Sequence, residues 1–228
     1  MLCLFDIDGT LIGGDGAGRR SFDRACIEIL GDVFSGKNPL DHLKLDGMTD
    51  PLILREVFDV HLRRVPTAIE SQAVFAAYVR LLEIEMATAA FRVHPGVEES
   101  IALLVERRAT IGLATGNLEE GARIKLSRGN LWRHFSFGGY GSDLPHGSTE
   151  RAEVVRVAIK RGVERAGRAF SAHEILVIGD TPKDISAAHA AGARAIAVAT
   201  GSYSVDQLKN AGADEAYQTL EEWHLHLR

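Results

Sequence analysis

The chain has 228 residues, 46% of them hydrophobic and 25% charged, with a formal net charge of −5 and an isoelectric point near 6.0. This length suits one domain, or a core domain with a smaller insertion, and the composition is that of an ordinary globular protein. The acidic balance argues against nucleic acid as a partner, because nucleic-acid-binding proteins normally present a basic face.

The two cysteines, Cys3 and Cys26, fall within apolar patterns. We expect both to be buried free thiols, which suits a reducing compartment. No apolar run approaches the roughly 20 residues that cross a bilayer, and the first residues lack the pattern of a cleavable signal peptide. We therefore expect no membrane partner and a cytoplasmic location, for either a monomer or a homodimer.

Five short apolar runs alternate with helical patterns along most of the chain. The runs cover residues 1–7, 110–114, 135–138, 175–178 and 194–198. Runs such as "ILVI" and "AIAV" are continuous, which is typical of strands buried on both faces of a parallel sheet. Apolar residues at helical spacing mark residues 97–108, 118–128, 149–163, 184–191 and 205–210. This alternation predicts an α/β fold with a doubly wound, parallel, Rossmann-like sheet.

The alternation stops after the first strand. From residue 15 to residue 86 the pattern is helical, with helices expected at 19–30, 51–65 and 71–86. The second of these follows Asp50, which we interpret as its N-cap. We therefore expect a Rossmann-like core formed by residues 1–14 and 87–228, with residues 15–86 inserted as a helical subdomain.

Carboxylates follow two of the expected strands, at the edge where an α/β sheet binds ligands. Asp6 and Asp8 lie two residues apart on an extended segment, so their side chains share one face. Asp180 ends a neighbouring strand, and Asp184 follows four residues later. Such acids would repel one another strongly without a cation, and hard oxygen ligands favour Mg²⁺ over zinc.

Thr115, Gly116 and Asn117 close the second long strand, just before a helix that we expect to begin near Leu118. The free N–H groups at a helix N-terminus form an anion site, and the threonine hydroxyl adds one more donor. We expect this segment to contact phosphate or substrate. Carboxylates with Mg²⁺ beside such a site indicate phosphoryl transfer.

Three motifs in this chain resemble motifs one, two and four of the haloacid dehalogenase superfamily, in that order: "DIDGT" at 6–10, "LATGN" at 113–117 and "GDTPKD" at 179–184. The resemblance covers the whole chain, because the helical insertion is similar to the superfamily's cap of the C1 type. Within the superfamily, the chain looks most like the phosphoglycolate-phosphatase-like group of small-molecule phosphatases.

The resemblance implies a role for each motif residue. Asp6 would be the nucleophile that becomes an aspartyl-phosphate. Asp8 would be the general acid for the leaving alkoxide and then the base for water. Mg²⁺ would be bound by Asp6, the backbone carbonyl of Asp8 and Asp180. Asp184 would support this metal site from its rim, and Thr115 would hydrogen-bond the phosphoryl group. Asp8 also disfavours a dehalogenase, since a departing halide needs no proton.

The superfamily's third motif is a lysine near the start of the helix that precedes the fourth strand, and no lysine stands there. Arg151 stands near the start of the helix expected at 149–163. Lys160 lies nine residues further along this helix, roughly 13 Å away, which is too far from the helix start. We predict that Arg151 replaces the motif lysine, with Lys183 as the reserve candidate. In the insertion, Gly47 and Thr49 are secondary candidates for contact with the substrate.

The leading hypothesis is a Mg²⁺-dependent phosphatase that acts on a small phosphorylated metabolite through an aspartyl-phosphate. Two alternatives stay open. A phosphosugar mutase of the same fold would return the phosphoryl group to a sugar, and a non-catalytic phosphate-binding regulatory module would bind phosphate without turnover. The departure at the third motif is the feature that supports the regulatory module.

Overall fold

The continuous apolar runs of the sequence form a six-stranded parallel sheet. The computed structural model describes residues 1–227, apart from the side chain of Asp32, and orders the strands β5-β4-β1-β6-β7-β8. They are β1 (Leu2–Phe5), β4 (Thr110–Ala114), β5 (Gly138–Gly139), β6 (Ile175–Gly179), β7 (Arg194–Val198) and β8 (Glu215–Tyr217). From β1 the chain winds outward in one direction to β5 and then in the other to β8. The predicted doubly wound α/β sheet is therefore confirmed.

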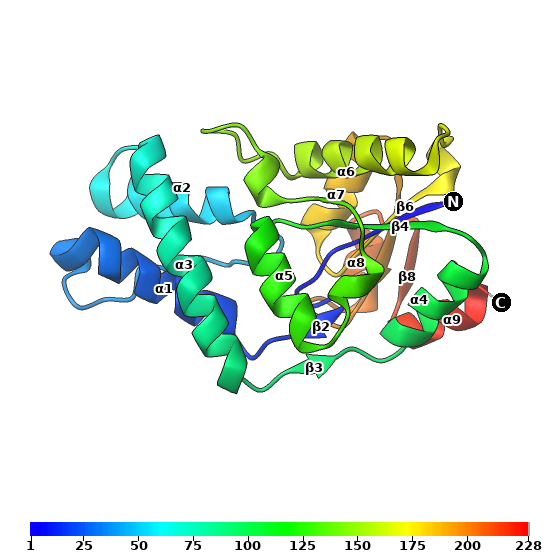
Figure 1. Cartoon of the computed structure of the whole chain (residues 1–228), viewed down its shortest axis with the longest axis horizontal. Coiled ribbons are helices and arrows are strands. Elements are labelled where there is room, and N and C mark those ends of the chain that lie inside the picture. The colour runs from blue at the N-terminus through cyan, green and yellow to red at the C-terminus, as the bar shows by residue number, and fades with distance from the viewer. Residues whose placement is uncertain (228) are drawn as a thin grey trace.

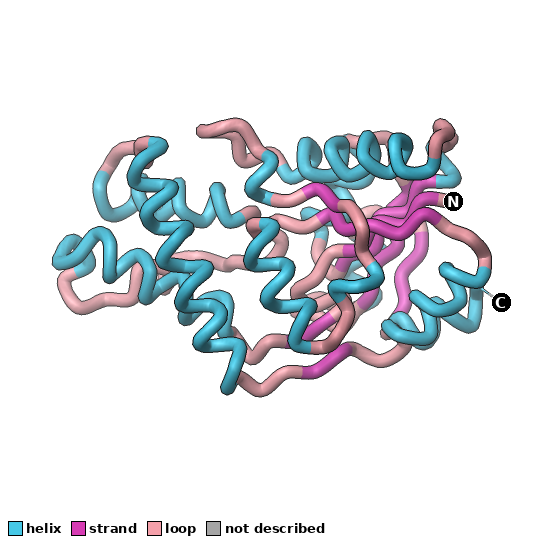
Figure 2. The backbone as a smooth tube through the Cα atoms, in the orientation of Figure 1, coloured by secondary structure: helices cyan, strands magenta, loops and turns pink. Residues whose placement is uncertain are grey.

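Helices cover both faces of the sheet (Figures 1 and 2). One face packs against α4 (Val97–Glu106), α5 (Glu119–Arg128) and α9 (Leu220–Leu227). The other packs against α6 (Arg151–Ala166), α7 (Pro182–Ala190) and α8 (Val205–Asn210). Side chains alternate along β1, so that Cys3 and Phe5 enter the first layer and Leu2 and Leu4 the second. Burial on both faces explains why the strand sequences are apolar throughout.

Three helices form a second body beside the sheet (Figure 1). They are α1 (Ala17–Leu30), α2 (Asp50–Leu62) and α3 (Ala68–Thr88), and their apolar faces share one buried cluster. At its centre the rings of Phe22 and Tyr78 lie 4.9 Å apart. Leu118, at the start of α5, joins the same cluster and connects it to the core. We call these three helices and the loops between them the cap.

The two segments that connect core and cap lie side by side. The short strands β2 (Ile12–Gly13) and β3 (Arg92–Val93) pair antiparallel, with Ile12 opposite Val93. We propose this ribbon as the boundary of the cap, close to the limits expected at residues 15 and 86. Two-residue strands carry no periodicity, so the sequence pattern did not indicate them.

Three local expectations differ from the structure. The strand expected at 135–138 is only Gly138–Gly139, because Phe135 turns into the core against Phe5, with ring centroids 6.1 Å apart. The N-cap of α2 is Thr49 rather than Asp50, and the Thr49 side chain accepts from the Leu52 N–H at 3.3 Å. The last segment forms helix α9, in which His224 is buried, although the helical patterns expected from the sequence end at residue 210.

Two other expectations can be compared directly with the described residues. Cys3 and Cys26 are both free and buried, as predicted. Among the described helices, none combines the length and the apolar content that crossing a membrane requires.

Candidate active site

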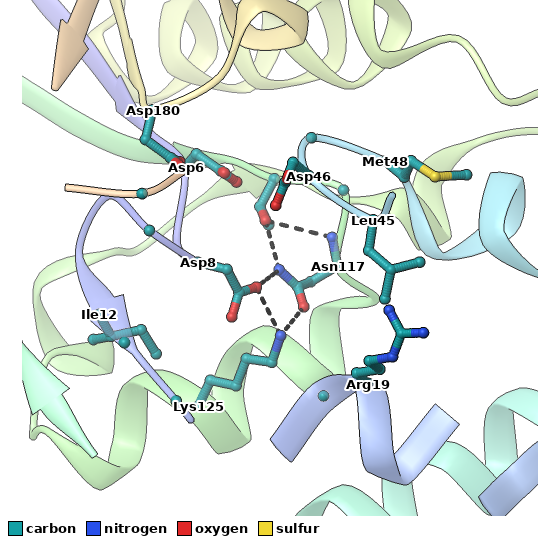
Figure 3. Close-up of a pocket in the computed structure, with 18 of the residues that line it drawn as sticks. Asp6, Asp8, Ile12, Arg19, Leu45, Asp46, Met48, Asn117, Lys125 and Asp180 are labelled. Atoms are coloured by element: carbon teal, nitrogen blue, oxygen red, sulfur yellow. Dashed lines mark hydrogen bonds and ion pairs between the residues drawn. The ribbon is translucent and has the colours of Figure 1, made fainter. Parts of the chain in front are cut away.

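The carboxyl ends of β1, β4 and β6 deliver polar side chains to one cavity of about 440 Å³. Asp6 and Asp8 follow β1, Thr115 follows β4, and Asp180 follows β6, as the strand order requires. Figure 3 shows Asp6 and Asp180 together on one wall and Asp8 apart from them. The opposite wall belongs to the cap and includes apolar side chains such as that of Phe22. The cavity therefore lies between core and cap.

Three buried carboxylates gather at the sheet edge. Asp6, Asp180 and Asp184 each place a carboxylate oxygen within 4.8 Å of the others. Burial raises the pKa of Asp6 to about 6, although the guanidinium of Arg151 opposes the effect. Burial also raises the pKa of Asp180 well above its usual range, and the neighbouring charges of Asp184 and Asp6 raise it further. When all three carboxylates are ionised, they leave two negative charges that the Arg151 guanidinium does not neutralise. A divalent cation would balance these two charges.

Asp180 is held by the turn at residues 9–10, which Thr200 supports from a second segment. The hydroxyl of Thr10 donates to its Oδ1 at 3.0 Å. Gly9 lies against it with φ +81°, and a Cβ on Gly9 would stand 2.3 Å from Asp180 Oδ2, so only glycine fits this turn. The hydroxyl of Thr200 donates to the Gly9 carbonyl and fixes the same turn. The sequence analysis had assigned Thr200 no role, because its partner lies 191 residues away.

Arg151 begins α6 and reaches the proposed nucleophile. Its Nη2 lies 3.1 Å from Asp6 Oδ1, and its Nε donates to Asp184 Oδ1 at 2.8 Å. A third contact, at 3.4 Å, runs to the carbonyl of Gly47 in the cap. The guanidinium therefore lies beside Asp6, and the substitution of Arg151 for the motif lysine stays a prediction. The reserve candidate, Lys183, is not part of the cavity lining and lies beside the turn at Gly47.

Asp8 belongs to a separate charged group. Its side chain is 49% exposed, and Lys125 Nζ lies 2.7 Å from its Oδ2. Asn117 Nδ2 donates to the same oxygen at 2.8 Å. Burial opposes ionisation of Asp8, but the Lys125 ammonium and these hydrogen bonds outweigh it and hold the pKa below its usual value. Lys125 was not among the residues predicted for the site. The available signal was a lysine three residues after Ala122 on the buried face of a helix.

The predicted anion site at the start of α5 is filled by the protein itself. The N–H of Leu118 donates to Asp50 Oδ2 at 2.8 Å, so a carboxylate from the cap lies at this helix N-terminus. Gly116 still lines the cavity, while its carbonyl accepts from the Asp50 N–H at 2.8 Å. The Thr115 hydroxyl hydrogen-bonds Asp6 and lowers its pKa. Asn117 is engaged by Asp8 and does not point freely at a ligand.

The two cap candidates differ in position. Gly47 lines the cavity and adopts φ +65°, which allows its carbonyl to meet Arg151. Thr49 lies outside the cavity lining, because its hydroxyl caps α2 and its side chain is buried. The interpretation of Thr49 as a substrate contact is therefore replaced by a structural one.

Asp50 offers a test of the charges in this region. Burial raises its pKa to about 6, with Lys125 opposing the effect. Because this pKa is higher in the folded protein than in the unfolded chain, ionisation of Asp50 destabilises the fold. This cost begins as the pH rises through about 4 and is complete above about pH 7. Asp50→Asn is therefore expected to raise the free energy of unfolding at pH 8 by up to about 3 kcal/mol.

Urea denaturation of wild type and Asp50→Asn at pH 4 and pH 8 measures this difference. The gain should shrink to below about 0.5 kcal/mol at pH 4, because Asp50 is then protonated in the folded state and about half protonated in the unfolded chain. The exposed Asp59 on the same helix is the matched control, and Asp59→Asn should change stability little at either pH. An equal gain at both pH values would contradict the assignment.

The chain matches the family model of haloacid dehalogenase-like hydrolases over residues 3–198 and belongs to this family. Among curated proteins it is similar to "Probable phosphatase IndB" of Dickeya dadantii (strain 3937). The two sequences are 30% identical over 229 residues, which covers 97% of this chain and 90% of the relative.

Solved structures share the fold at lower identity. A hydrolase from Pseudomonas syringae superposes with a TM-score of 0.73 at 20% identity, covering 99% of this chain and 97% of that one. CbbY from Rhodobacter sphaeroides, in complex with phosphate, gives 0.70 at 20% identity, covering 97% and 95%. A "predicted phosphoglycolate phosphatase" from Haemophilus somnus 129pt gives 0.69 at 17% identity, covering 100% and 97%. These likenesses confirm the haloacid dehalogenase-like fold.

Proposed function

We propose that the protein is a Mg²⁺-dependent phosphatase that hydrolyses a small phosphorylated metabolite through an aspartyl-phosphate on Asp6. The observation that carries the proposal is the setting of Asp6. One of its oxygens lies 3.1 Å from the Arg151 guanidinium, and two further buried carboxylates lie beside it. The similarity to a relative named as a phosphatase supports the same reaction class.

The residues present fit a divalent cation. Asp6 and Asp180 would hold Mg²⁺ together with the backbone carbonyl of Asp8, and Asp184 would stand at the rim. The fit rests on the close approach of three buried carboxylate oxygens and on the raised pKa values of Asp6 and Asp180. When bound, Mg²⁺ would offset negative charge on the phosphoryl oxygens.

The side chains then divide the reaction between them. The Asp6 carboxylate attacks phosphorus as the bond to the leaving oxygen breaks, and Asp8 gives that oxygen a proton. Asp8 next takes a proton from water, which attacks the aspartyl-phosphate and releases inorganic phosphate and free Asp6. A phosphate dianion that enters the cavity favours protonation of Asp8, whereas Lys125 favours the carboxylate that the second step needs.

The cap limits what can reach Asp6. The cavity of about 440 Å³ has an apolar wall that includes Phe22 and Tyr78, together with the cations Arg19 and Arg92. A space of this size suits a metabolite rather than a phosphorylated protein. Closure of the cap over the substrate would exclude bulk water from the aspartyl-phosphate.

The proposal is tested by measuring inorganic phosphate release from a panel of small phosphomonoesters, with and without Mg²⁺. Excess EDTA is expected to abolish release, and added Mg²⁺ to restore it, because the carboxylates around Asp6 otherwise repel the substrate phosphate. The control is the unfolding temperature, which should show that EDTA leaves the protein folded. Undiminished turnover in EDTA would contradict the metal assignment.

The phosphosugar mutase remains the second candidate. Asp6, Asp8 and the metal-binding carboxylates would act in the same way whether the phosphoryl group passes to water or to a sugar. It predicts transfer of phosphate between sugar positions without net release, which the same panel detects with phosphorylated hexoses. The contact between Arg151 and Asp6 supports a catalytic role over a regulatory module, because Arg151 supplies a cation beside the proposed nucleophile.

A further inference from the structure

Lys125 is a buried cation that the third motif does not explain. It projects from α5, its side chain is 7% exposed, and its Nζ lies 2.7 Å from Asp8 Oδ2 and 2.6 Å from Asn117 Oδ1. Figure 3 shows Lys125, Asp8 and Asn117 joined by these contacts, and all three residues line the cavity. A buried ammonium is costly, and an apolar side chain would pack a helix face without that cost.

The three side chains form a closed set of contacts. Asn117 Nδ2 donates to Asp8 Oδ2 at 2.8 Å and to Thr115 Oγ1 at 2.8 Å, while Asn117 Oδ1 accepts from Lys125. Lys125 therefore determines which way the Asn117 amide faces, because its donors must meet the amide oxygen. Both contacts to Asp8 engage Oδ2, so Oδ1 is the oxygen that remains for proton exchange with a leaving group or water.

We propose that Lys125 is a positioning residue that fixes the Asp8 carboxylate, directly and through Asn117, in the orientation needed for proton transfer to the leaving group. This inference rests on the proposed phosphatase function. Two contacts from different elements restrict the rotamers of Asp8, whose side chain is otherwise half exposed. Proton transfer requires hydrogen-bond distance between the acid and the leaving oxygen, so loss of this orientation would reduce general acid catalysis.

A rival role for Lys125 is structural. Its charge also lowers the pKa of the buried Asp50, so the lysine stabilises the boundary between cap and core. The two roles differ in their dependence on the leaving group. A nitrophenolate departs readily without a proton, whereas an alkoxide needs one. A positioning role therefore affects alkyl phosphates selectively, and a structural role affects both substrate types alike.

The experiment compares kcat and KM of Lys125→Met with wild type on an alkyl phosphate from the panel and on p-nitrophenyl phosphate. We expect kcat to fall roughly 10²-fold on the alkyl phosphate, within the range of general acid catalysis, and by only about threefold on p-nitrophenyl phosphate. Lys125→Arg should recover part of the loss. The matched control is Lys160→Met, at an exposed lysine of α6, which should behave as wild type.

Asp8→Asn completes the test. If Lys125 acts through Asp8, Lys125→Met should cause no further selective loss on alkyl phosphates in the Asp8→Asn background. If Lys125→Met does not fold, the double variant Lys125→Met/Asp50→Asn takes its place. The second substitution removes the buried Asp50 charge that Lys125 offsets in wild type. Equal losses on both substrates would overturn the positioning role alone. Absence of turnover by wild type, or turnover that survives in Asp6→Asn, would instead contradict the proposed function.

Discussion

Replacement of Asp6 by asparagine is expected to lower phosphate release by roughly 10³-fold or more, because an amide cannot form the aspartyl-phosphate. The substitution keeps the size of the side chain. It also removes a charge whose burial is unfavourable, because burial raises the pKa of Asp6 to about 6. The variant should therefore be folded at pH 7. Phosphate release at saturating substrate and Mg²⁺ measures the loss.

The control for this variant is Asp206→Asn, the same chemical change at an exposed position on α8. It should leave turnover within about twofold of wild type, as surface substitutions usually do. Acid quenching during turnover, followed by peptide mass analysis, should find phosphate on the peptide that contains Asp6 in wild type only. Phosphate release by Asp6→Asn above a tenth of the wild-type rate would show that another group is the nucleophile.

Arg151→Ala is expected to reduce kcat/KM by roughly 10²-fold. The guanidinium lies 3.1 Å from Asp6 Oδ1 and also contacts Asp184, so its loss leaves buried carboxylates facing an anionic substrate. Arg151→Lys should lose less activity than Arg151→Ala, because lysine keeps the positive charge and is the residue type of the third motif. It should not recover full activity, because an ammonium lacks the planar, two-pronged geometry of the guanidinium. Steady-state kinetics of both variants measure the difference.

A matched control lies on the same helix. Arg156 is exposed and contacts Glu153 and the carbonyl of Ala190, away from the cavity. Arg156→Ala should leave kcat/KM close to that of wild type. Loss of Arg151 could also destabilise the fold by leaving charges unpaired, so the thermal unfolding of each variant is compared in Mg²⁺. Wild-type kinetics in folded Arg151→Ala would refute the substitution for the motif lysine.

The sheet edge that carries the candidate site could be predicted from the sequence, because backbone geometry determines where parallel strands end. A strand buried on both faces is visible as a continuous apolar run, and parallel strands end at the same edge. Asp6 and Asp180 each follow such a strand directly, so their approach required no knowledge of side-chain packing. Arg151 could be placed for a similar reason, since it stands in the first turn of a helix that leads into β6.

The remaining site residues depend on contacts between distant segments. Lys125 meets Asp8 across 117 positions, and Asp50 meets the Leu118 N–H across 68. Neither partner is indicated by local spacing. The first contact exists only once α5 has packed against the sheet, and the second only once the cap has packed against α5. The same limit applies to β8, whose three residues are too short for a pattern and pair only with β7.

The β2–β3 ribbon has a consequence for how this fold can be altered. Paired residues of antiparallel strands lie about 5 Å apart, so the excursion that contains the cap begins and ends at neighbouring points, with Ile12 opposite Val93. Longer or shorter inserts between such points differ little in the entropy of closing the chain. The ribbon therefore places little demand on the length of the insertion, whereas the contacts of Gly47 with Arg151 and of Asp50 with Leu118 constrain its sequence.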